Sequence, residues 1–129
     1  MTATILYIED NPLNMRLVRK LVKSFGYDMI EAVDGITGLE MVKSERPDLV
    51  LVDVNLPGID GLEVASTIKA SPELASIPTI ALTANAMHGD RERCLAAGCD
   101  GYIAKPIARQ ELKNTIVRFL PDDSQIVTT

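Results

Sequence analysis

Apolar segments typical of β-strands alternate with segments of helical periodicity along the chain, and this alternation restricts the fold more than any other feature. The strand-like segments cover residues 4–9, 28–33, 48–54, 78–84 and 99–104. The clearest helix lies between the first two, where apolar residues from Leu13 to Phe25 recur at helical spacing behind the capping pair Asn11-Pro12. Five strand–helix units with short connections predict an α/β domain with a parallel sheet.

The strand-like segments also differ in a way that indicates their order in the sheet. The first, third and fourth are the most continuously apolar, as expected of central strands that are covered on both faces. The second carries Glu31 and the fifth contains Gly101, so both suit the edges. This pattern favours the order 2-1-3-4-5, in which right-handed crossovers place helices on both faces and a topological switch point lies between strands 1 and 3.

Glycine and proline residues mark the expected ends of the other helices. The second helix should end before Pro47, the third near Ser71-Pro72, the fourth (87–97) at Gly98 and the fifth before Pro121. The domain is therefore expected to cover residues 1–120, and residues 121–129 are expected to form a short C-terminal tail.

Polar side chains stand at the carboxyl ends of four of the predicted strands. The first strand ends in Glu9 and Asp10, the third in Asp53 and the fourth in Thr83, and the fifth leads to Lys105. Each residue alone could serve local structure, as a helix cap or a solvated loop charge. In a parallel sheet, however, all the carboxyl ends lie at one edge, which is where α/β sheets bind ligands.

The chemistry of this edge follows from its charge. Three carboxylates beside one lysine favour a hard divalent cation such as Mg²⁺, and the lack of His or Cys at these positions disfavours zinc. A carboxylate next to Mg²⁺, with a lysine and a hydroxyl opposite, can accept a phosphoryl group. Asp53 is the best nucleophile, because it ends a central strand and is followed by the turn Pro57-Gly58; the product would be an aspartyl phosphate.

With these residues in place, the chain resembles the response-regulator receiver domain over residues 3–120. The resemblance is carried by YIEDNPLNM (7–15), LVDVNLPGIDG (51–61), ALTANAM (81–87) and GYIAKPI (101–107), in the order and spacing of the family. It implies a flavodoxin-like, doubly wound (βα)5 fold with the strand order given above. Both stand-alone single-domain receivers and the receiver domains of hybrid histidine kinases are similar to this chain.

The resemblance implies roles for the acidic residues. Asp53 would be the phosphoacceptor and a ligand of the metal ion. Glu9 and Asp10 would form the pair that holds Mg²⁺, Asp10 directly and Glu9 through water, with Mn²⁺ as a substitute cation. The backbone carbonyl of Asn55 would supply a further ligand.

The resemblance also implies which residues bind and sense the phosphoryl group. Thr83, next to the small residue Ala84, would bind its oxygens, and Lys105 would pair with the phosphoacceptor and the phosphate. The peptide bond between Lys105 and Pro106 would be cis. Tyr102 would move inward when the threonine shifts.

Two asparagines occupy the positions expected to tune autodephosphorylation. Asn55 and Asn85 lie two residues beyond the phosphoacceptor and the switch threonine, respectively. Both are polar and neutral, and Ala84 is small, so we expect an accessible phosphate with a lifetime of ordinary length.

The implied function is a phosphorylation-controlled switch in a two-component or phosphorelay system. A sensor histidine kinase or a histidine phosphotransfer protein would donate the phosphoryl group, and the chain would catalyse only its own phosphorylation and dephosphorylation. Output would pass to a protein target through the face of the fourth helix, fifth strand and fifth helix, in a monomer or a phosphorylation-dependent dimer. The segment DRER (90–93) is expected to be a solvated helix face that contacts partners.

The extent of the protein leaves two interpretations. Met1 and the polar tail favour a stand-alone receiver, and the alternative is a receiver domain excised from a hybrid histidine kinase or a longer regulator.

Two other classes of protein fit the sequence poorly. A phosphohydrolase with an aspartyl nucleophile would pair two aspartates after the first strand. A flavin or nucleotide carrier would need a Gly- or Ser/Thr-rich phosphate loop there, where this chain has the acidic EDNPLN.

Composition and residue spacing also bear on the partners, the location and the cysteines of the chain. A formal net charge of −5, with 4% aromatic residues and no Trp, argues against direct nucleic-acid binding. No apolar run approaches the length of a membrane span and the N-terminus lacks the features of a signal peptide, so a cytoplasmic location is expected. Cys94 and Cys99 lack metal-ligand spacing and are expected to be buried or half-buried free thiols.

Overall fold

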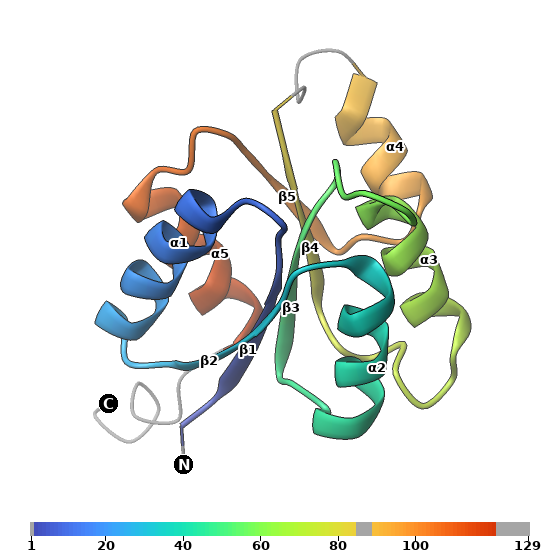
Figure 1. The fold of residues 1–129 in the computed structure, drawn as a ribbon, viewed down its shortest axis with the longest axis horizontal. Helices are drawn as coiled ribbons and strands as arrows, with labels where there is room; N and C mark the ends of the chain where they lie inside the picture. The colour runs from blue at the N-terminus through green and yellow to red at the C-terminus, as the bar shows by residue number, and fades with distance from the viewer. Residues whose placement is uncertain (1, 85–88, 121–129) are drawn as a thin grey trace.

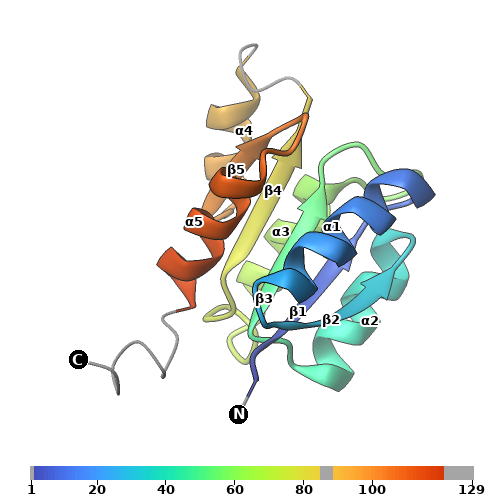
Figure 2. The same ribbon diagram turned by 90° about the vertical axis from the view of Figure 1, so that its left-hand side faces the viewer.

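The computed structural model describes residues 2–84 and 89–120, which form a parallel sheet with helices on both faces (Figure 1). The strands are β1 (Thr4–Ile8), β2 (Asp28–Ala32), β3 (Leu49–Asp53), β4 (Thr79–Thr83) and β5 (Gly101–Ala104). The helices are α1 (Pro12–Ser24), α2 (Gly35–Glu45), α3 (Gly61–Ala70), α4 (Arg91–Ala96) and α5 (Arg109–Phe119). Helices α1 and α5 cover one face of the sheet, and α2, α3 and α4 cover the other (Figures 1 and 2).

The strand order is β2-β1-β3-β4-β5 and every pairing is parallel, so the predicted fold class, strand order and edge strands are confirmed. Within the described residues the fourth helix is shorter than expected, because α4 begins at Arg91 and ends at Ala96. The first two residues of the predicted helix, 87 and 88, lie outside the described part of the chain, as does the predicted tail, 121–129.

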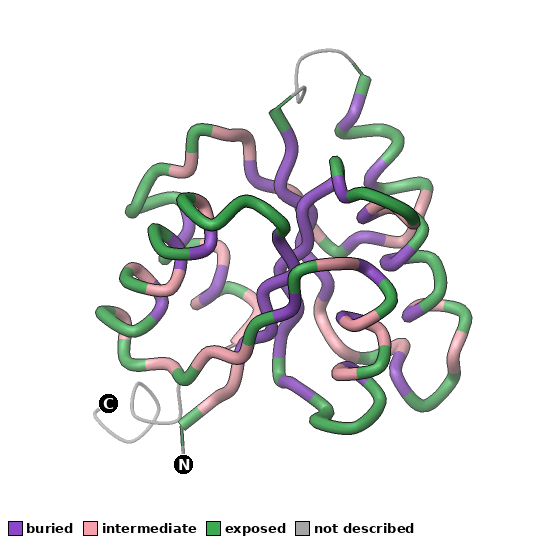
Figure 3. The backbone as a smooth tube through the Cα atoms, viewed as in Figure 1, coloured by how far each residue is buried: buried purple, intermediate pink, exposed green. Residues whose placement is uncertain are grey.

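The alternation of side chains along β1 divides the interior into two main layers. Ile5 and Tyr7 pack against α1 and α5, whereas Leu6 and Ile8 pack against α2 and α3. All four are fully buried, and Figure 3 shows the same burial through the central strands, with exposed residues on the outer faces of the helices. The residue that follows Ile8 therefore belongs to the α1/α5 side of the sheet and lies at its carboxyl edge.

The register of the strands brings the polar residues of the sequence to one edge. Ile8 pairs with Val52, so Glu9 and Asp53 are neighbours at the ends of adjacent strands. Asp53 pairs in turn with Leu82 of β4, one residue before Thr83. The three strand ends are thus fixed side by side by main-chain pairing, before any side-chain contact is considered.

Two local features hold this edge in place. The side chain of Asn11 accepts hydrogen bonds from the main-chain N–H groups of Leu13 (2.8 Å) and Asn14 (3.1 Å), and Pro12 is the first residue of α1, as predicted. Gly61, the first residue of α3, packs so closely that a Cβ atom there would lie 2.1 Å from the carbonyl oxygen of Asp53. Only glycine allows α3 to begin directly behind that residue.

In the part of the chain that the structure describes, no helix combines the length and the apolar character needed to cross a membrane.

Candidate functional site

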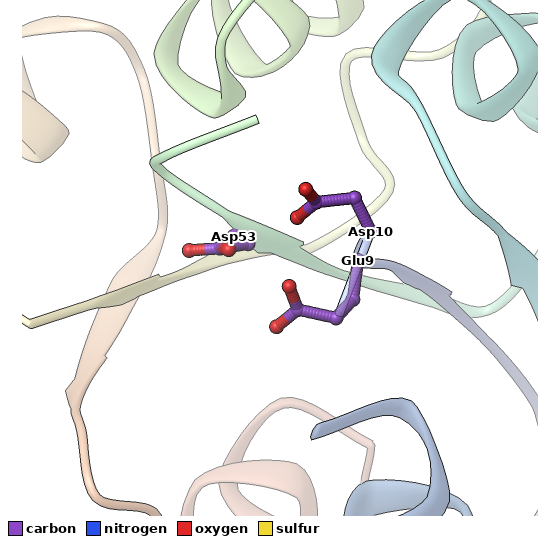
Figure 4. Close-up of side chains that lie close together, drawn as sticks. All are labelled: Glu9, Asp10 and Asp53. Carbon is purple, nitrogen blue, oxygen red and sulfur yellow. The ribbon is translucent and has the colours of Figure 1, made fainter. Parts of the chain in front are cut away.

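Three carboxylates converge at the carboxyl edge of the sheet (Figure 4). Glu9 and Asp10 follow β1, and Asp53 is the last residue of β3. Each offers an oxygen that lies within 4.8 Å of the oxygens of the other two. Glu9 is 1% exposed and Asp53 is 3% exposed, whereas Asp10 lies at the surface. The cluster therefore has one open side, next to Asp10, and a buried base.

A single lysine faces the cluster from the loop after β5. The Nζ atom of Lys105 lies 3.1 Å from Oδ1 of Asp53 and 3.2 Å from Oε1 of Glu9. Its main chain is tied to β4, because the N–H of Lys105 donates to the carbonyl of Thr83 at 2.8 Å. The peptide bond between Lys105 and Pro106 is cis. Glu9, Asp53 and Lys105, which are far apart in the sequence, thus form one ion-paired group.

The two buried acids hold their protons with different strength. Burial, and after it the nearby Glu9, raise the pKa of Asp53 to about 6 against the opposing effect of Lys105. Burial alone would also raise the pKa of Glu9. Hydrogen bonds to Tyr7 and Asp53 and the charge of Lys105 outweigh it, so the pKa of Glu9 lies below its ordinary value. As the pH falls, Asp53 therefore takes up a proton before Glu9 does.

The donor set of the cluster fits a hard divalent cation. Its ligating atoms are carboxylate oxygens, and three negative charges face the one ammonium group of Lys105. Mg²⁺ prefers oxygen ligands of this kind and keeps several of its waters, which the open side next to Asp10 would accommodate. Asn55 lies beside the cluster, since its N–H donates to Oδ1 of Asp53 at 3.2 Å.

Thr83 ends β4 with its hydroxyl turned toward α4. The hydroxyl donates to Oδ2 of Asp90 at 2.5 Å, and Oδ1 of Asp90 accepts from Nη1 of Arg93 at 2.6 Å. The prediction that the whole DRER segment is solvated is therefore wrong for Asp90, which is 4% exposed, while the three residues after it are exposed. Asp90 is buried because it enters α4 directly against the end of β4, a tertiary contact that helical periodicity does not reveal.

The remaining predicted residues fall on the same edge or outside the described chain. Tyr102 pairs with Ala81 across β4 and β5, two pairs before Thr83 and Ala104, and it packs half-buried against the small apolar cluster next to α4. Ala84 is exposed directly after β4, and Asn85 lies outside the described residues.

Both cysteines are free and buried, as predicted. Burial raises the pKa of the Cys94 thiol, and it raises the pKa of the Cys99 thiol to about 12. Neither thiol takes part in the acidic cluster.

Sequence reasoning missed one residue of this site, Tyr7. Its hydroxyl donates to Oε1 of Glu9 at 2.7 Å, although the ring lies in the apolar layer under α1 and α5. The available signal was its position, because a residue two before Glu9 on a strand must share its face. Within an apolar strand, however, a tyrosine is indistinguishable by pattern from a residue that only fills the hydrophobic core.

Comparison with known proteins identifies the family of the chain. The family model described as the response regulator receiver domain matches residues 5–117. The chain is 43% identical over 122 residues to the polar-differentiation response regulator DivK of Brucella ovis, a match that covers 95% of this chain and 99% of that protein.

Solved structures show the same fold. The receiver domain of a sensor histidine kinase from Pseudomonas aeruginosa, which has a magnesium ion coordinated in its active site cleft, superposes with a TM-score of 0.88 at 38% identity. That match covers 95% of this chain and all (100%) of the other. The chemotaxis response regulator CheY4 of Vibrio cholerae gives a TM-score of 0.86 at 25% identity and covers 93% of this chain and 100% of its own. The chain belongs to the response regulator receiver domain family.

Proposed function

We propose that Asp53 accepts a phosphoryl group from a phosphohistidine and that the domain is a phosphorylation-controlled switch which signals by protein contact. One observation carries this proposal: the Asp53 carboxylate lies between an acidic pair, Glu9 and Asp10, and the ammonium group of Lys105. The phosphodonor would be a sensor histidine kinase or a histidine phosphotransfer protein, the partner class of the receiver family.

In the proposed step, a carboxylate oxygen of Asp53 attacks the phosphorus atom. The new P–O bond forms as the P–N bond of phosphohistidine breaks, and the electron pair of that bond stays on the imidazole nitrogen. Although burial raises the pKa of Asp53 to about 6, most of the carboxyl is ionised near pH 7 and can act as the nucleophile. Lys105, 3.1 Å from Oδ1, offsets the negative charge that the phosphoryl oxygens bring.

The acidic pair supports this step by holding a cation. Asp10, Asp53 and the main-chain carbonyl of Asn55 would bind Mg²⁺, with Glu9 acting through water, and Mn²⁺ would serve as a substitute. When bound, the cation offsets the charge between the carboxylates and the phosphoryl oxygens. The magnesium ion in the Pseudomonas aeruginosa receiver supports this assignment.

Thr83 would couple the phosphoryl group to α4. A hydroxyl has one hydrogen to donate, so Thr83 must give up Asp90 when it binds a phosphoryl oxygen. Asp90 and Arg93 then lose their link to the end of β4, and Tyr102 would move inward beside it. This change would bias the face of α4, β5 and α5 toward a downstream protein or a second copy of the domain.

The lifetime of the aspartyl phosphate would depend on the residues around its open side. Asn55 and Ala84, both exposed, lie beyond the phosphoacceptor and the switch threonine and leave the phosphate accessible to water. Asn85 would complete this set.

The direct test is incubation of the protein with phosphoramidate, with and without Mg²⁺, followed by intact-mass measurement. One phosphoryl addition that requires Mg²⁺ and is absent from Asp53→Asn is the expected result. An addition of equal size in Asp53→Asn would place the acceptor elsewhere and refute the proposal.

A further inference from the structure

Tyr7 carries a buried hydroxyl group directly beneath the acidic cluster. It is the last residue but one of β1 and is 0% exposed, and its hydroxyl donates to Oε1 of Glu9 at 2.7 Å. Because side chains alternate along a strand, Tyr7 and Glu9 share the face of the sheet that packs against α1 and α5. The contact is therefore built into the strand itself.

Packing alone does not account for a tyrosine at this position. The ring belongs to an apolar cluster that also contains Met15 of α1, Leu51 of β3 and Leu112 of α5. A phenylalanine would fill the same space without the cost of placing a hydroxyl in an apolar layer. The oxygen of Tyr7 instead supplies a hydrogen-bond donor to one atom, Oε1 of Glu9.

That donor, at 2.7 Å, lies closer to the Glu9 carboxylate than Lys105 or the main chain of Asn11 does. Oε1 also lies 3.2 Å from Nζ of Lys105, and Oε2 accepts from the N–H of Asn11 at 3.3 Å. Lys105 is shared with Asp53 at a similar distance of 3.1 Å. Without the phenol, Glu9 would be free to turn toward Lys105 and draw it away from the phosphoacceptor.

We propose that Tyr7 is a positioning residue for the cation-binding site: its hydroxyl fixes the Glu9 carboxylate in the orientation that a divalent cation requires. The inference rests on the proposed function, since it assigns Glu9 to the same cation. The phenol donates the hydrogen of this bond and Oε1 of Glu9 accepts it at 2.7 Å. Outer hydrogen-bond partners of this kind determine how well a ligand group is oriented.

The test compares Tyr7→Phe with Tyr27→Phe, which removes a phenol from the same layer away from the cluster. Mg²⁺ binding to the unphosphorylated proteins is measured by calorimetry. The Mg²⁺ concentration that half-saturates Tyr7→Phe should rise by about tenfold or more, the range seen when outer partners of a metal ligand are removed. Tyr27→Phe should bind like the wild type. Equal half-saturation of Tyr7→Phe and wild type would overturn the inference.

A second comparison separates positioning from general damage to the fold. In phosphoramidate reactions, Tyr7→Phe should need more Mg²⁺ but reach a similar rate at saturating Mg²⁺, because Asp53 and Lys105 are unchanged. The effect of Tyr7→Phe should vanish in a Glu9→Ala background, since Tyr7 then has no carboxylate to hold. A loss that persists in that background would show that Tyr7 acts elsewhere and would refute the proposal.

A third measurement needs no substitution at Tyr7. The chain has three tyrosines and no Trp, so its near-ultraviolet absorbance reports mainly on tyrosine. Bound Mg²⁺ withdraws charge from Glu9, and the spectra of wild type and Tyr27→Phe should shift alike; unchanged spectra at saturating Mg²⁺ would contradict the inference. Calorimetry also keeps the two proposals distinct, because Mg²⁺ binding can be compared even if the wild type gains no phosphoryl group.

Discussion

The hydroxyl of Thr83 donates a hydrogen bond to the buried carboxylate of Asp90 over 2.5 Å. This bond joins the end of β4 to the entrance of α4, and Arg93 extends it one turn into the helix. The residue proposed to bind the phosphoryl group is thus already engaged by an acid. A phosphoryl oxygen and Asp90 would compete for the same hydroxyl hydrogen. The bond between Thr83 and Asp90 therefore stabilises the unphosphorylated conformation.

Removing Asp90 should therefore favour the phosphorylated conformation. Hydrogen bonds to charged groups contribute about 1.5–3 kcal/mol, so Asp90→Ala should bind beryllofluoride, an acyl-phosphate mimic, about tenfold more tightly in the presence of Mg²⁺. Glu92→Ala, an exposed acid on the same helix, should bind like the wild type. The gain should disappear in a Thr83→Ala background. Equal affinity of Asp90→Ala and wild type would show that the bond does not restrain Thr83.

The buried carboxylate of Asp53 should lower the stability of the metal-free protein at neutral pH. Burial raises the pKa of Asp53 to about 6 in the folded state, above its value in the unfolded chain. The folded state then binds the proton more tightly, so the free energy of unfolding contributed by this group increases as the pH falls from about 6 to about 4. Asp53→Asn should stabilise the protein by on the order of 1–3 kcal/mol at pH 7.

Urea unfolding of metal-free protein at pH 7 and pH 4 checks the predicted direction of this change in the free energy of unfolding. The advantage of Asp53→Asn over wild type should become much smaller at the lower pH, where the folded state and roughly half of the unfolded chains carry the proton. Asp28→Asn, at an exposed position on β2, controls for a simple change of net charge. A stabilisation that stays the same at both pH values would rule out this titration as its cause.

Divalent cations should reverse that destabilisation. A ligand that binds only the folded state adds about 2.7 kcal/mol to the free energy of unfolding at one hundred times its dissociation constant. Wild-type protein should therefore unfold at a higher temperature in Mg²⁺ than in a chelator. Asp10→Asn should lose most of this increase, because Asp10 supplies the exposed oxygen of the cluster. Na⁺ at the same ionic strength separates binding of the divalent cation from screening.

The sequence was sufficient for the fold because local and tertiary signals agree. Asn11 and Pro12 begin α1 where capping chemistry predicts, and continuous apolar runs identify β1, β3 and β4 as central strands. The convergence of Glu9, Asp10 and Asp53 was predictable because parallel strands end at a common edge. Their positions follow from topology, which hydrophobic patterning reveals.

Asp90 and Tyr7 were not predictable in the same way. Asp90 is buried by the end of β4, a segment separated from it in the sequence, and its charged neighbours give the pattern of a solvated helix. Tyr7 satisfies the apolar pattern of β1 with its ring, which conceals the polar contact made by its oxygen. In both residues the informative property is the direction of one polar atom, and periodicity carries no information about that direction.

Two leucines on α1 should affect the rate of phosphoryl transfer from a phosphohistidine protein. Leu13 is 70% exposed and Leu17 is 44% exposed, one helical turn apart on the helix that starts directly after Asp10 and Asn11. We expect a phosphohistidine protein that reaches Asp53 to contact this surface, because two neighbouring exposed leucines beside the site suit a protein contact.

Leu13→Glu should slow phosphoryl transfer from a phosphohistidine protein by about tenfold or more, because a buried charge without a partner is costly in an interface. Phosphorylation by phosphoramidate should be unchanged, since that donor needs no docking surface. Ile36→Glu is the matched control, because Ile36 is 62% exposed but lies on α2, on the opposite face of the sheet. Transfer can be followed as loss of label from the donor protein. Equal slowing by both substitutions would mean that added charge, and not contact with α1, governs the reaction.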